Sequence, residues 1–372
     1  MGDNRLIKLA KILLDHSLKV NKGDKFLIST SIEAKPLVKE IIKYANAIGA
    51  YAFVEFSDDE IDRLLLEGTS EEKVDYSLRV ANVKYEGIMG RIRIRCVGNE
   101  SEKSNVDRDT MNMIAKKNAK LNDILINEKR WVLLDYPTLV GAMKSKMTME
   151  EYEDYVLNVT TIDYQGLYNK ALKLKELMEK TDKVRIVGPG TDVTFSIKGM
   201  NAVICYGERN LPDGEVYTAP VKNSVNGKLT YNVTTIYQGK TFDNVCLEFK
   251  DGKIINASAS ANNRALNMIL DTDEGARYIG EFSFGLNPLI KKGIGNILFD
   301  EKMSGSFHFT PGNCYKKADN GNYSAIHWDM VCSQFIENGG GEIYFDDVLI
   351  RKDGLFVIDE LLNLNPNKIL KK

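Results

Sequence analysis

The first half of the chain alternates apolar segments of helical and of strand periodicity. Leucines recur every three or four positions over residues 4–20, with lysines between them, which predicts an amphipathic surface helix. KFLIST (25–30), a helical stretch that ends at Gly49, and YAFVEF (51–56) follow. Strand, helix and strand in this order predict a βαβ unit. Later strands, in EGIMGRIRIRCV from Glu86 and RWVLLD from Arg130, extend this to a mostly parallel, helix-covered sheet.

The pattern changes in the second half. Thr148 and Glu151 form a capping-box pair at the start of a predicted helix, and another helix runs to about Lys180. Short β-branched segments with glycine and asparagine turns then dominate, with one clear helix from Asn263. We therefore predict two domains. An α/β N-terminal domain with a mostly parallel sheet covers 1–181, and an α+β C-terminal catalytic domain with a largely antiparallel sheet covers 182–372.

Length and composition narrow the classes of function. The 372 residues exceed the roughly 250–300 at which a single hydrophobic core stops growing, which agrees with two predicted domains. Lysine and arginine number 50 against 52 aspartates and glutamates, which indicates no nucleic-acid partner. No G-x-G-x-x-G follows the first strand, so a dinucleotide site is not expected.

The chain is predicted to be cytoplasmic, with no membrane partner. Its five cysteines are scattered and never form a C-x-x-C pair, which argues against both a disulfide framework and a thiolate zinc site. The N-terminus lacks the unbroken apolar core of a signal peptide. No apolar run approaches the 18 residues of a membrane span.

Candidate chemistry is concentrated between residues 297 and 330, which contain two of the three histidines. If His327, Trp328 and Asp329 form a strand, the first and third side chains share a face and can reach one ion. Further acidic residues lie beside turns in the second half: Glu215, Glu281, Asp300 and Glu301, the last two before His308. Carboxylates and imidazoles without a thiolate suit Zn²⁺, Co²⁺ or Mn²⁺, and this set is acidic enough for two ions.

Three functions are compatible with these residues. Two divalent ions could activate a shared water and hold a free amino group, as an aminopeptidase requires, with Tyr315 as a candidate to stabilise the oxyanion. Alternatively, His308, His327 and Asp329 alone could hold one Fe(II) for oxygenase-type chemistry. That alternative leaves Glu215 and Glu281 without a role. The third possibility is a non-catalytic, degenerate homologue of such an enzyme, which keeps the fold and the dimer and serves as a binding module.

An ordered series of short motifs resembles the thermophilic-type metallo-aminopeptidases, the group that includes aminopeptidase T and aminopeptidase S. The motifs are GTDVTF (190–195), NLPDGEVYTAP (210–220), GARYIGE (275–281), LFDE (298–301), the segment 308–315 and IHWDM (326–330). The resemblance also extends into the first half. It implies a cytosolic, cocatalytic two-metal exopeptidase, usually a homodimer, that hydrolyses N-terminal residues from short peptides.

The resemblance also implies roles for individual residues. Tyr315 matches the catalytic tyrosine. In the mechanism we expect for a two-metal aminopeptidase, Glu281 or another site carboxylate carries a proton to the leaving amine. The positions that match metal ligands, with Glu301 as an acidic position near the site, are Glu215, Glu281, Glu301, His308, His327 and Asp329. Two divalent ions per chain are expected, drawn from Zn, Co, Mn or Mg.

Overall fold

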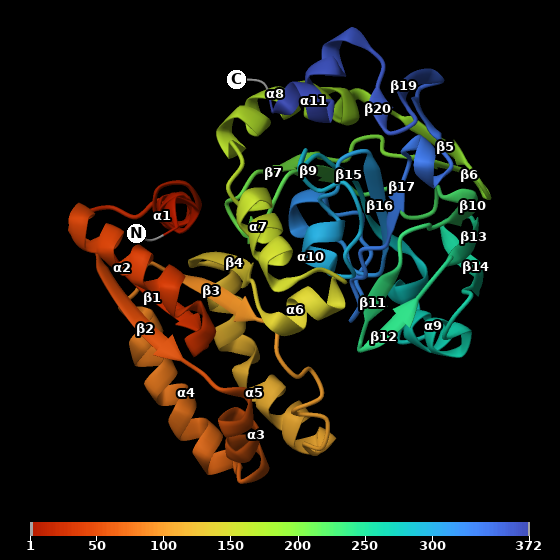
Figure 1. Ribbon diagram of the computed structural model, residues 1–372. Helices are drawn as coiled ribbons and strands as arrows, with labels where there is room; N and C mark the ends of the chain where they lie inside the picture. Colours follow the sequence, from red (N-terminus) through yellow and green to blue (C-terminus); the bar gives the residue numbers. More distant parts are fainter. Residues whose placement is uncertain (1–2, 371–372) are drawn as a thin grey trace. The chain divides into compact units, whose positions relative to one another are not determined.

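The computed structural model describes residues 3–370 (Figure 1). The chain forms two compact units. Unit 1 contains the chain up to Ile162 together with Gly207–Leu211, and unit 2 contains Asp163–Tyr206 together with the chain from Pro212 onward. The units interleave along the sequence, whereas the domain limits 1–181 and 182–372 are contiguous; those limits stay a prediction.

Unit 1 is built on one parallel sheet. Its strand order is β2-β1-β3-β4-β8, and every neighbouring pair is parallel, as the βαβ pattern predicted. The strands are β1 (Lys25–Thr30), β2 (Tyr51–Phe56), β3 (Gly90–Cys96), β4 (Arg130–Tyr136) and β8 (Asn210–Leu211).

Helices connect these strands. They are α1 (Asn4–Lys11), α2 (Lys35–Ile48), α3 (Asp59–Glu67), α4 (Glu71–Glu86), α5 (Arg108–Asn127), α6 (Leu139–Lys144) and α7 (Met149–Val159). The helix predicted over 4–20 is α1 followed by a π-helical segment, Ile12–Ser17, in which Leu13 and Leu14 are both buried. α2 ends at Gly49, whose φ of 76° lies in the left-handed region that favours glycine. α7 starts with the predicted capping box of Thr148 and Glu151.

Unit 2 contains two antiparallel sheets and a short hairpin, β11–β12. The larger sheet has eight strands in the order β14-β13-β10-β6-β5-β18-β19-β20, and the smaller has five in the order β17-β16-β15-β9-β7. The strands are β5 (Lys183–Gly188), β6 (Thr191–Ser196), β7 (Val203–Cys205), β9 (Glu215–Thr218), β10 (Asn226–Thr230), β11 (Thr235–Tyr237), β12 (Lys240–Phe242), β13 (Cys246–Lys250), β14 (Lys253–Ser258), β15 (Ile279–Gly285), β16 (Ser306–Pro311), β17 (Val331–Ser333), β18 (Glu342–Phe345), β19 (Val348–Lys352) and β20 (Leu355–Phe356). Its α-helices are α8 (Tyr164–Lys180), α9 (Asn263–Leu270), α10 (Ile297–Asp300) and α11 (Pro366–Ile369). The predicted fold classes of both halves are confirmed.

Phenylalanines fill the space between the two sheets of unit 2. Phe282 of β15 lies 5.0 Å, centroid to centroid, from Phe195 of β6, and Phe309 of β16 lies 5.9 Å from Phe249 of β13. Because side chains alternate along a strand, the residues between these phenylalanines face the opposite side of the five-stranded sheet. Among residues 3–370, no helix is long and apolar enough to cross a membrane.

Candidate metal centre

The side of the five-stranded sheet that faces away from the phenylalanine core carries the predicted ligands. In the ladder between β15 and β16, Ser283 lies opposite His308, and Glu281 lies opposite Thr310. β9 adds Glu215, opposite Gly285 of β15. The register and the two-residue alternation therefore place Glu215, Glu281 and His308 on one face.

These three residues form the buried centre of the site. The Nε2 atom of His308 lies 2.9 Å from Oε1 of Glu281 and 3.4 Å from Oε2 of Glu215. One ligand atom from each of the three residues lies within 4.8 Å of the others. This is a spacing at which one ion can contact all three.

His327 and Asp329 border this centre. His327 Nε2 lies 3.1 Å from Oδ1 of Asp329 and 3.8 Å from Oε2 of Glu281. Trp328 is buried elsewhere, stacked on Tyr237 at 4.7 Å between ring centroids. The two polar side chains share a side as predicted, but the predicted strand is wrong. His327 makes only an isolated bridge, to Gly312. The segment is held by the hydrogen bond that Asp329 accepts from Thr310 and by the one between His327 Nδ1 and the backbone carbonyl of Asn313.

Glu301 and Tyr315 complete the predicted set. Glu301 directly follows α10, and its backbone carbonyl lies 3.2 Å from Nδ1 of His308. The ring of Tyr315 lies 4.7 Å from the ring of His327. The seven residues that match the family's site are thus gathered at one place in unit 2, while their individual roles stay predictions. Asp300, the other acidic candidate, instead accepts hydrogen bonds from the backbone N–H groups of Ile294 and Gly295.

A buried lysine in this cluster was not predicted from the sequence. Lys302 is 2% exposed, and its Nζ lies 2.6 Å from Oε1 of Glu215 and 2.7 Å from Oε1 of Glu301. It also lies 3.8 Å from Oδ1 of Asp213, another buried carboxylate. Asp213 and Glu215 form a second ligand-like group with Cys205, and the lysine ammonium already neutralises charge there. Lysine is among the residues least often buried, so only its position next to Glu301 could have signalled this role.

Two hydroxyl groups orient the carboxylates. Ser283 donates a hydrogen bond of 3.1 Å to Oε2 of Glu215, and Thr310 donates one of 2.7 Å to Oδ1 of Asp329. Ser283 and Thr310 each lie two residues after a predicted ligand on the same strand. Strand alternation could therefore have identified both from the sequence.

The two histidines are basic in this environment. Burial alone would lower the pKa of His308, but its hydrogen bond to Glu281 and the charge of Glu215 raise the pKa to about 9. Burial likewise acts against the charged form of His327, yet Asp329 raises its pKa to about 10. Both imidazoles therefore carry a proton at neutral pH in the metal-free chain. A metal ion binds only neutral imidazole, so metal uptake at neutral pH would have to release these protons.

The pKa values of the carboxyl groups in the site are shifted in different directions. Burial raises the pKa of Glu301 to about 8, and the charge of Lys302 offsets only part of that effect. Burial also raises the pKa of Glu281. Burial would raise the pKa of Asp329 too, but the adjoining His327 lowers it below the usual range. The cluster therefore contains both a firmly ionised carboxylate, Asp329, and a carboxyl able to hold a proton near neutral pH, Glu301.

The arrangement fits divalent metal ions. Each histidine turns Nδ1 to a backbone carbonyl, of Glu301 at 3.2 Å or of Asn313 at 2.7 Å, so Nε2 is left facing the carboxylates. Metal-binding histidines typically have such a partner on the second nitrogen. Among residues 3–370, Oε2 of Glu281 is buried and has no hydrogen-bond partner. Such an atom is costly unless something satisfies it, and a metal ion would do so.

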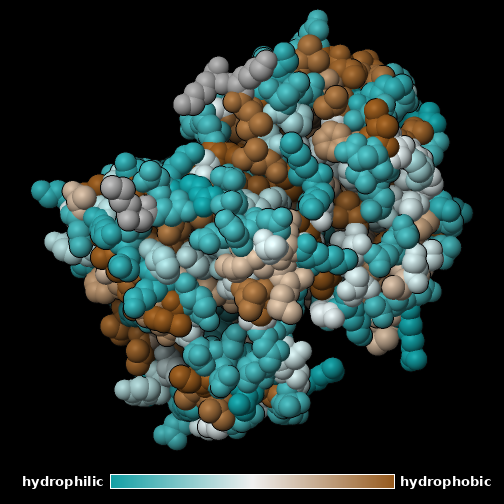
Figure 2. Space-filling view, viewed as in Figure 1, coloured by the Kyte–Doolittle hydropathy of each residue, from teal (hydrophilic) through white to brown (hydrophobic). Residues whose placement is uncertain are grey.

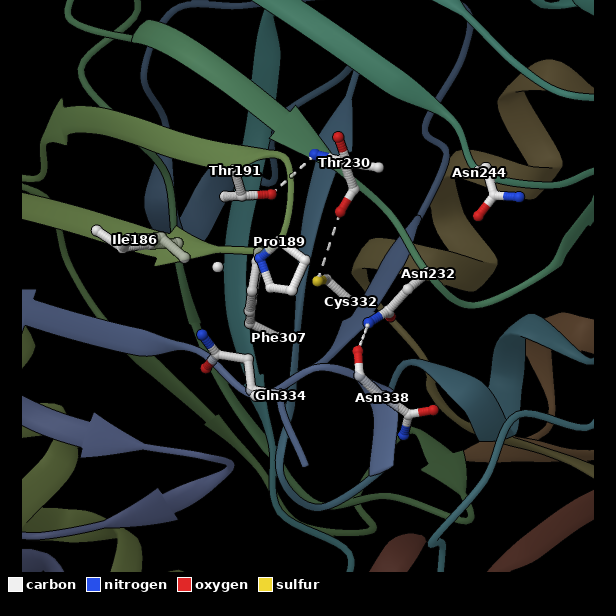
Figure 3. Close-up of a pocket in the computed structure, with 13 residues that line it drawn as sticks. Ile186, Pro189, Thr191, Thr230, Asn232, Asn244, Phe307, Cys332, Gln334 and Asn338 are labelled. Atoms are coloured by element: carbon white, nitrogen blue, oxygen red, sulfur yellow. Dashed lines mark hydrogen bonds between the residues drawn. The ribbon is translucent and has the colours of Figure 1, made fainter. Parts of the chain in front are cut away.

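A separate cavity of about 160 Å³ lies on the other side of the five-stranded sheet (Figure 3). Phe307 and Cys332 line it, and they are paired with each other across β16 and β17, next to the pair of His308 and Val331. Side chains alternate along each strand, so this cavity and His308 face opposite sides. Part of its polar lining is internally bonded: Figure 3 shows Thr191 accepting the N–H of Thr230. The cavity is not part of the metal centre.

The fold and the cluster define a metalloenzyme with a carboxylate-rich centre on an antiparallel sheet. A family model described as thermophilic metalloprotease (M29) matches residues 2–356. The chain belongs to this family, as the motif series indicated.

Characterised relatives and a solved structure agree with this assignment. The chain is 22% identical to Aminopeptidase 2 of Geobacillus stearothermophilus over 84% of each sequence. It is 25% identical to Aminopeptidase T of Thermus aquaticus, over 90% of this chain and 94% of the relative. The structure of wild-type AmpT from Thermus thermophilus matches 95% of this chain and 99% of its own, with a TM-score of 0.77 at 21% identity. At the level of the family, the prediction of a metallo-aminopeptidase is thereby confirmed, and the oxygenase and non-catalytic alternatives find no support.

Proposed function

We propose that this chain is a two-metal aminopeptidase that releases N-terminal residues from short peptides. The observation that carries the proposal is the charge of the cluster. The cluster contains five carboxylates, of Asp213, Glu215, Glu281, Glu301 and Asp329, and one lysine, Lys302, so two divalent ions would leave it neutral once the carboxylates are ionised and the two histidines have released their protons. One ion would leave a buried excess of negative charge, which is unfavourable.

The chain's own residues support hydrolysis in complementary ways. When bound, two divalent ions lower the pKa of a shared water and polarise the substrate carbonyl. Glu215, Glu281, His308, His327 and Asp329 would hold them. Glu281 has the geometry of a bridging carboxylate, since its two oxygens face different histidines, at 2.9 Å and 3.8 Å.

We assign proton transfer to the carboxyl groups whose pKa is raised by burial. A general acid or base works best when its pKa lies near the working pH. Burial moves the pKa of both Glu281 and Glu301 upward, Glu301 to about 8. Glu281 would carry the proton to the leaving amine, or Glu301 would do so where both oxygens of Glu281 are engaged by the ions.

Tyr315 would donate a hydrogen bond to the oxyanion. The residue is 48% exposed and so can reach a substrate. Partial burial of its phenol, and then the negative charges of Glu281 and Asp329, raise its pKa well above 10. The hydroxyl therefore keeps its proton and stays a donor at neutral and moderately alkaline pH.

The test is to remove metal with a chelator, reload with Zn²⁺, Co²⁺, Mn²⁺ or Mg²⁺ separately, and measure metal content alongside amino-acid release. We expect two ions per chain and release from peptides with a free α-amine but not from N-acetylated peptides. One iron per chain would favour the oxygenase alternative, and two ions without turnover would favour a non-catalytic protein. Full activity without bound metal would exclude the proposal.

Tyr315→Phe should lower kcat by about 10²–10³-fold, because it removes one oxyanion donor and leaves the metal ligands intact. Metal content should not change, and KM should change little. Tyr323→Phe is the matched control, since Tyr323 is 67% exposed and bonds Asp319 rather than the site. An unchanged kcat in Tyr315→Phe would remove the tyrosine from the mechanism.

The family resemblance further supports a cytoplasmic homodimer. We include both properties in the proposal.

A further inference from the structure

The cavity on the far side of the five-stranded sheet is open because β5 has a glycine where a side chain would fill it. Ile186 and Gly188 both line this space of about 160 Å³. Residues two apart on a strand share a face, so a side chain at position 188 would enter the cavity. A Cβ atom there would lie 3.5 Å from the backbone oxygen of Gly340, which is an ordinary contact distance. The fold therefore tolerates a side chain at this position, and the glycine leaves the space empty of protein atoms.

The cavity is accessible from solvent and its lining is uncharged. Pro189 and Asn338 of the lining are exposed, whereas Ile186 and Phe307 are buried. None of the thirteen described residues drawn around it in Figure 3 carries a charge. An ionised group is costly to bury without a partner, so the cavity disfavours ions, including amino acids and peptides with free termini. The nearby strands β10, β13 and β14 present mostly hydrophilic surface in Figure 2, which indicates a small ligand rather than an apolar protein partner.

Several polar side chains of the lining already have hydrogen-bond partners. The amide of Asn232 donates to the backbone carbonyl of Ser333 and accepts the N–H of the same residue, both at 2.8 Å. The hydroxyl of Thr230 donates to the backbone carbonyl of Gly190 at 2.8 Å. Asn338 donates to the hydroxyl of Ser333 at 2.9 Å. These bonds hold the wall of the cavity in place.

The side-chain amide of Gln334 is different. Gln334 lines the cavity and is 2% exposed, and among residues 3–370 its Oε1 is a buried atom without a hydrogen-bond partner. A buried amide oxygen is costly to leave unsatisfied. The last torsion of a glutamine side chain is broad and roughly twofold, so the amide can turn either its oxygen or its NH₂ group to the cavity. A ligand that carries both a donor and an acceptor would satisfy it in either orientation.

We propose that this cavity binds a small uncharged molecule with a primary amide head and a short aliphatic body. The head pairs with the amide of Gln334, and the body packs against Ile186 and Phe307. An apolar cavity of about 150 Å³ holds a molecule of the size of benzene, so the ligand has about six non-hydrogen atoms. The site is separate from the proposed peptidase centre, because His308 and Phe307 are neighbours on β16 and face opposite sides of the sheet.

The test is ligand-observed NMR and thermal unfolding of the full chain with isobutyramide, an uncharged amide of that size. Isobutyramide should bind in the millimolar range and raise Tm, because a ligand that binds only the folded chain stabilises it. Gly188→Leu should abolish this binding, since the leucine occupies the cavity. Isobutyrate, which has the same shape and a charge, should show no binding that Gly188→Leu removes.

Gln334→Leu should bind isobutyramide about 5–10-fold more weakly, because it keeps the apolar wall and removes the hydrogen-bonding partner. Gln165→Leu is the matched control and should bind as the wild type does, since Gln165 is an exposed residue of α8 that bonds Asn169. Circular dichroism establishes that each variant is folded.

Absence of isobutyramide binding to the wild type would overturn the proposal, as would undiminished binding to a folded Gly188→Leu. Isobutyrate binding that Gly188→Leu removes would overturn the requirement for an uncharged ligand. If Gly188→Leu does not fold, equal affinities of Gln334→Leu and Gln165→Leu for isobutyramide would overturn the assignment. None of these results bears on peptidase activity.

Discussion

Asp329→Ala and His327→Ala should each abolish metal uptake and the release of N-terminal amino acids. Asp329 is firmly ionised because its burial is offset by His327, and it contacts that imidazole at 3.1 Å. Removing either residue takes away one of the two predicted ligands that border the buried centre formed by Glu215, Glu281 and His308. The loss of metal affinity should exceed the roughly 10–100-fold that follows loss of a residue that only supports a ligand.

Metal content after dialysis and kcat/KM on a dipeptide measure this prediction. His16→Ala is the matched control, because His16 belongs to the π-helical segment of unit 1, outside the cluster. Asp329→Asn separates charge from shape, since it keeps the size of the side chain but not its charge. If either alanine variant retained two ions per chain, the assignment of that residue as a ligand would fail.

Periodicity was sufficient to predict the fold class. Apolar runs such as KFLIST and YAFVEF are long enough to be strands, and the helix between them has a clear end at Gly49, so the parallel βαβ unit is legible in the sequence. The antiparallel sheets of unit 2 are predicted less precisely, because the sequence shows only short β-branched segments between turns. Their pairing joins strands far apart in the chain, such as β5 with β18, which local periodicity cannot specify.

The residues of the candidate site were likewise only partly predictable from the sequence. Rare residue types made His308, His327 and the motif carboxylates visible in the sequence. His327 and Asp329 share a side although no strand holds them, because a bridge to Gly312 and side-chain hydrogen bonds replace the ladder. Lys302 stayed hidden because a lysine is expected in solvent, and only the tertiary fold brings Glu215 to it from 87 residues away.

Lys302→Met should therefore destabilise the metal-free protein strongly. The lysine is the buried cation between Glu215 and Glu301, and removing one partner of a buried ion pair typically costs about 3–5 kcal/mol. Burial acts to lower its pKa, but these carboxylates raise it well above 10.5, so the charge is present throughout the physiological pH range. The free energy of unfolding in urea, measured with a chelator present, should fall by about that amount.

Zinc should restore more stability to Lys302→Met than it adds to the wild type, because metal ions supply positive charge to the carboxylates that the lysine has left. Lys198→Met is the control: Lys198 pairs with Asp182 at 3.1 Å but is 75% exposed, and such a surface pair contributes at most about 1 kcal/mol. An equal loss of stability in Lys302→Met with and without zinc would mean that the side chain acts by filling space. The unequal loss expected here would identify Lys302 as a permanent part of the charge that this cluster requires, with the metal ions supplying the rest.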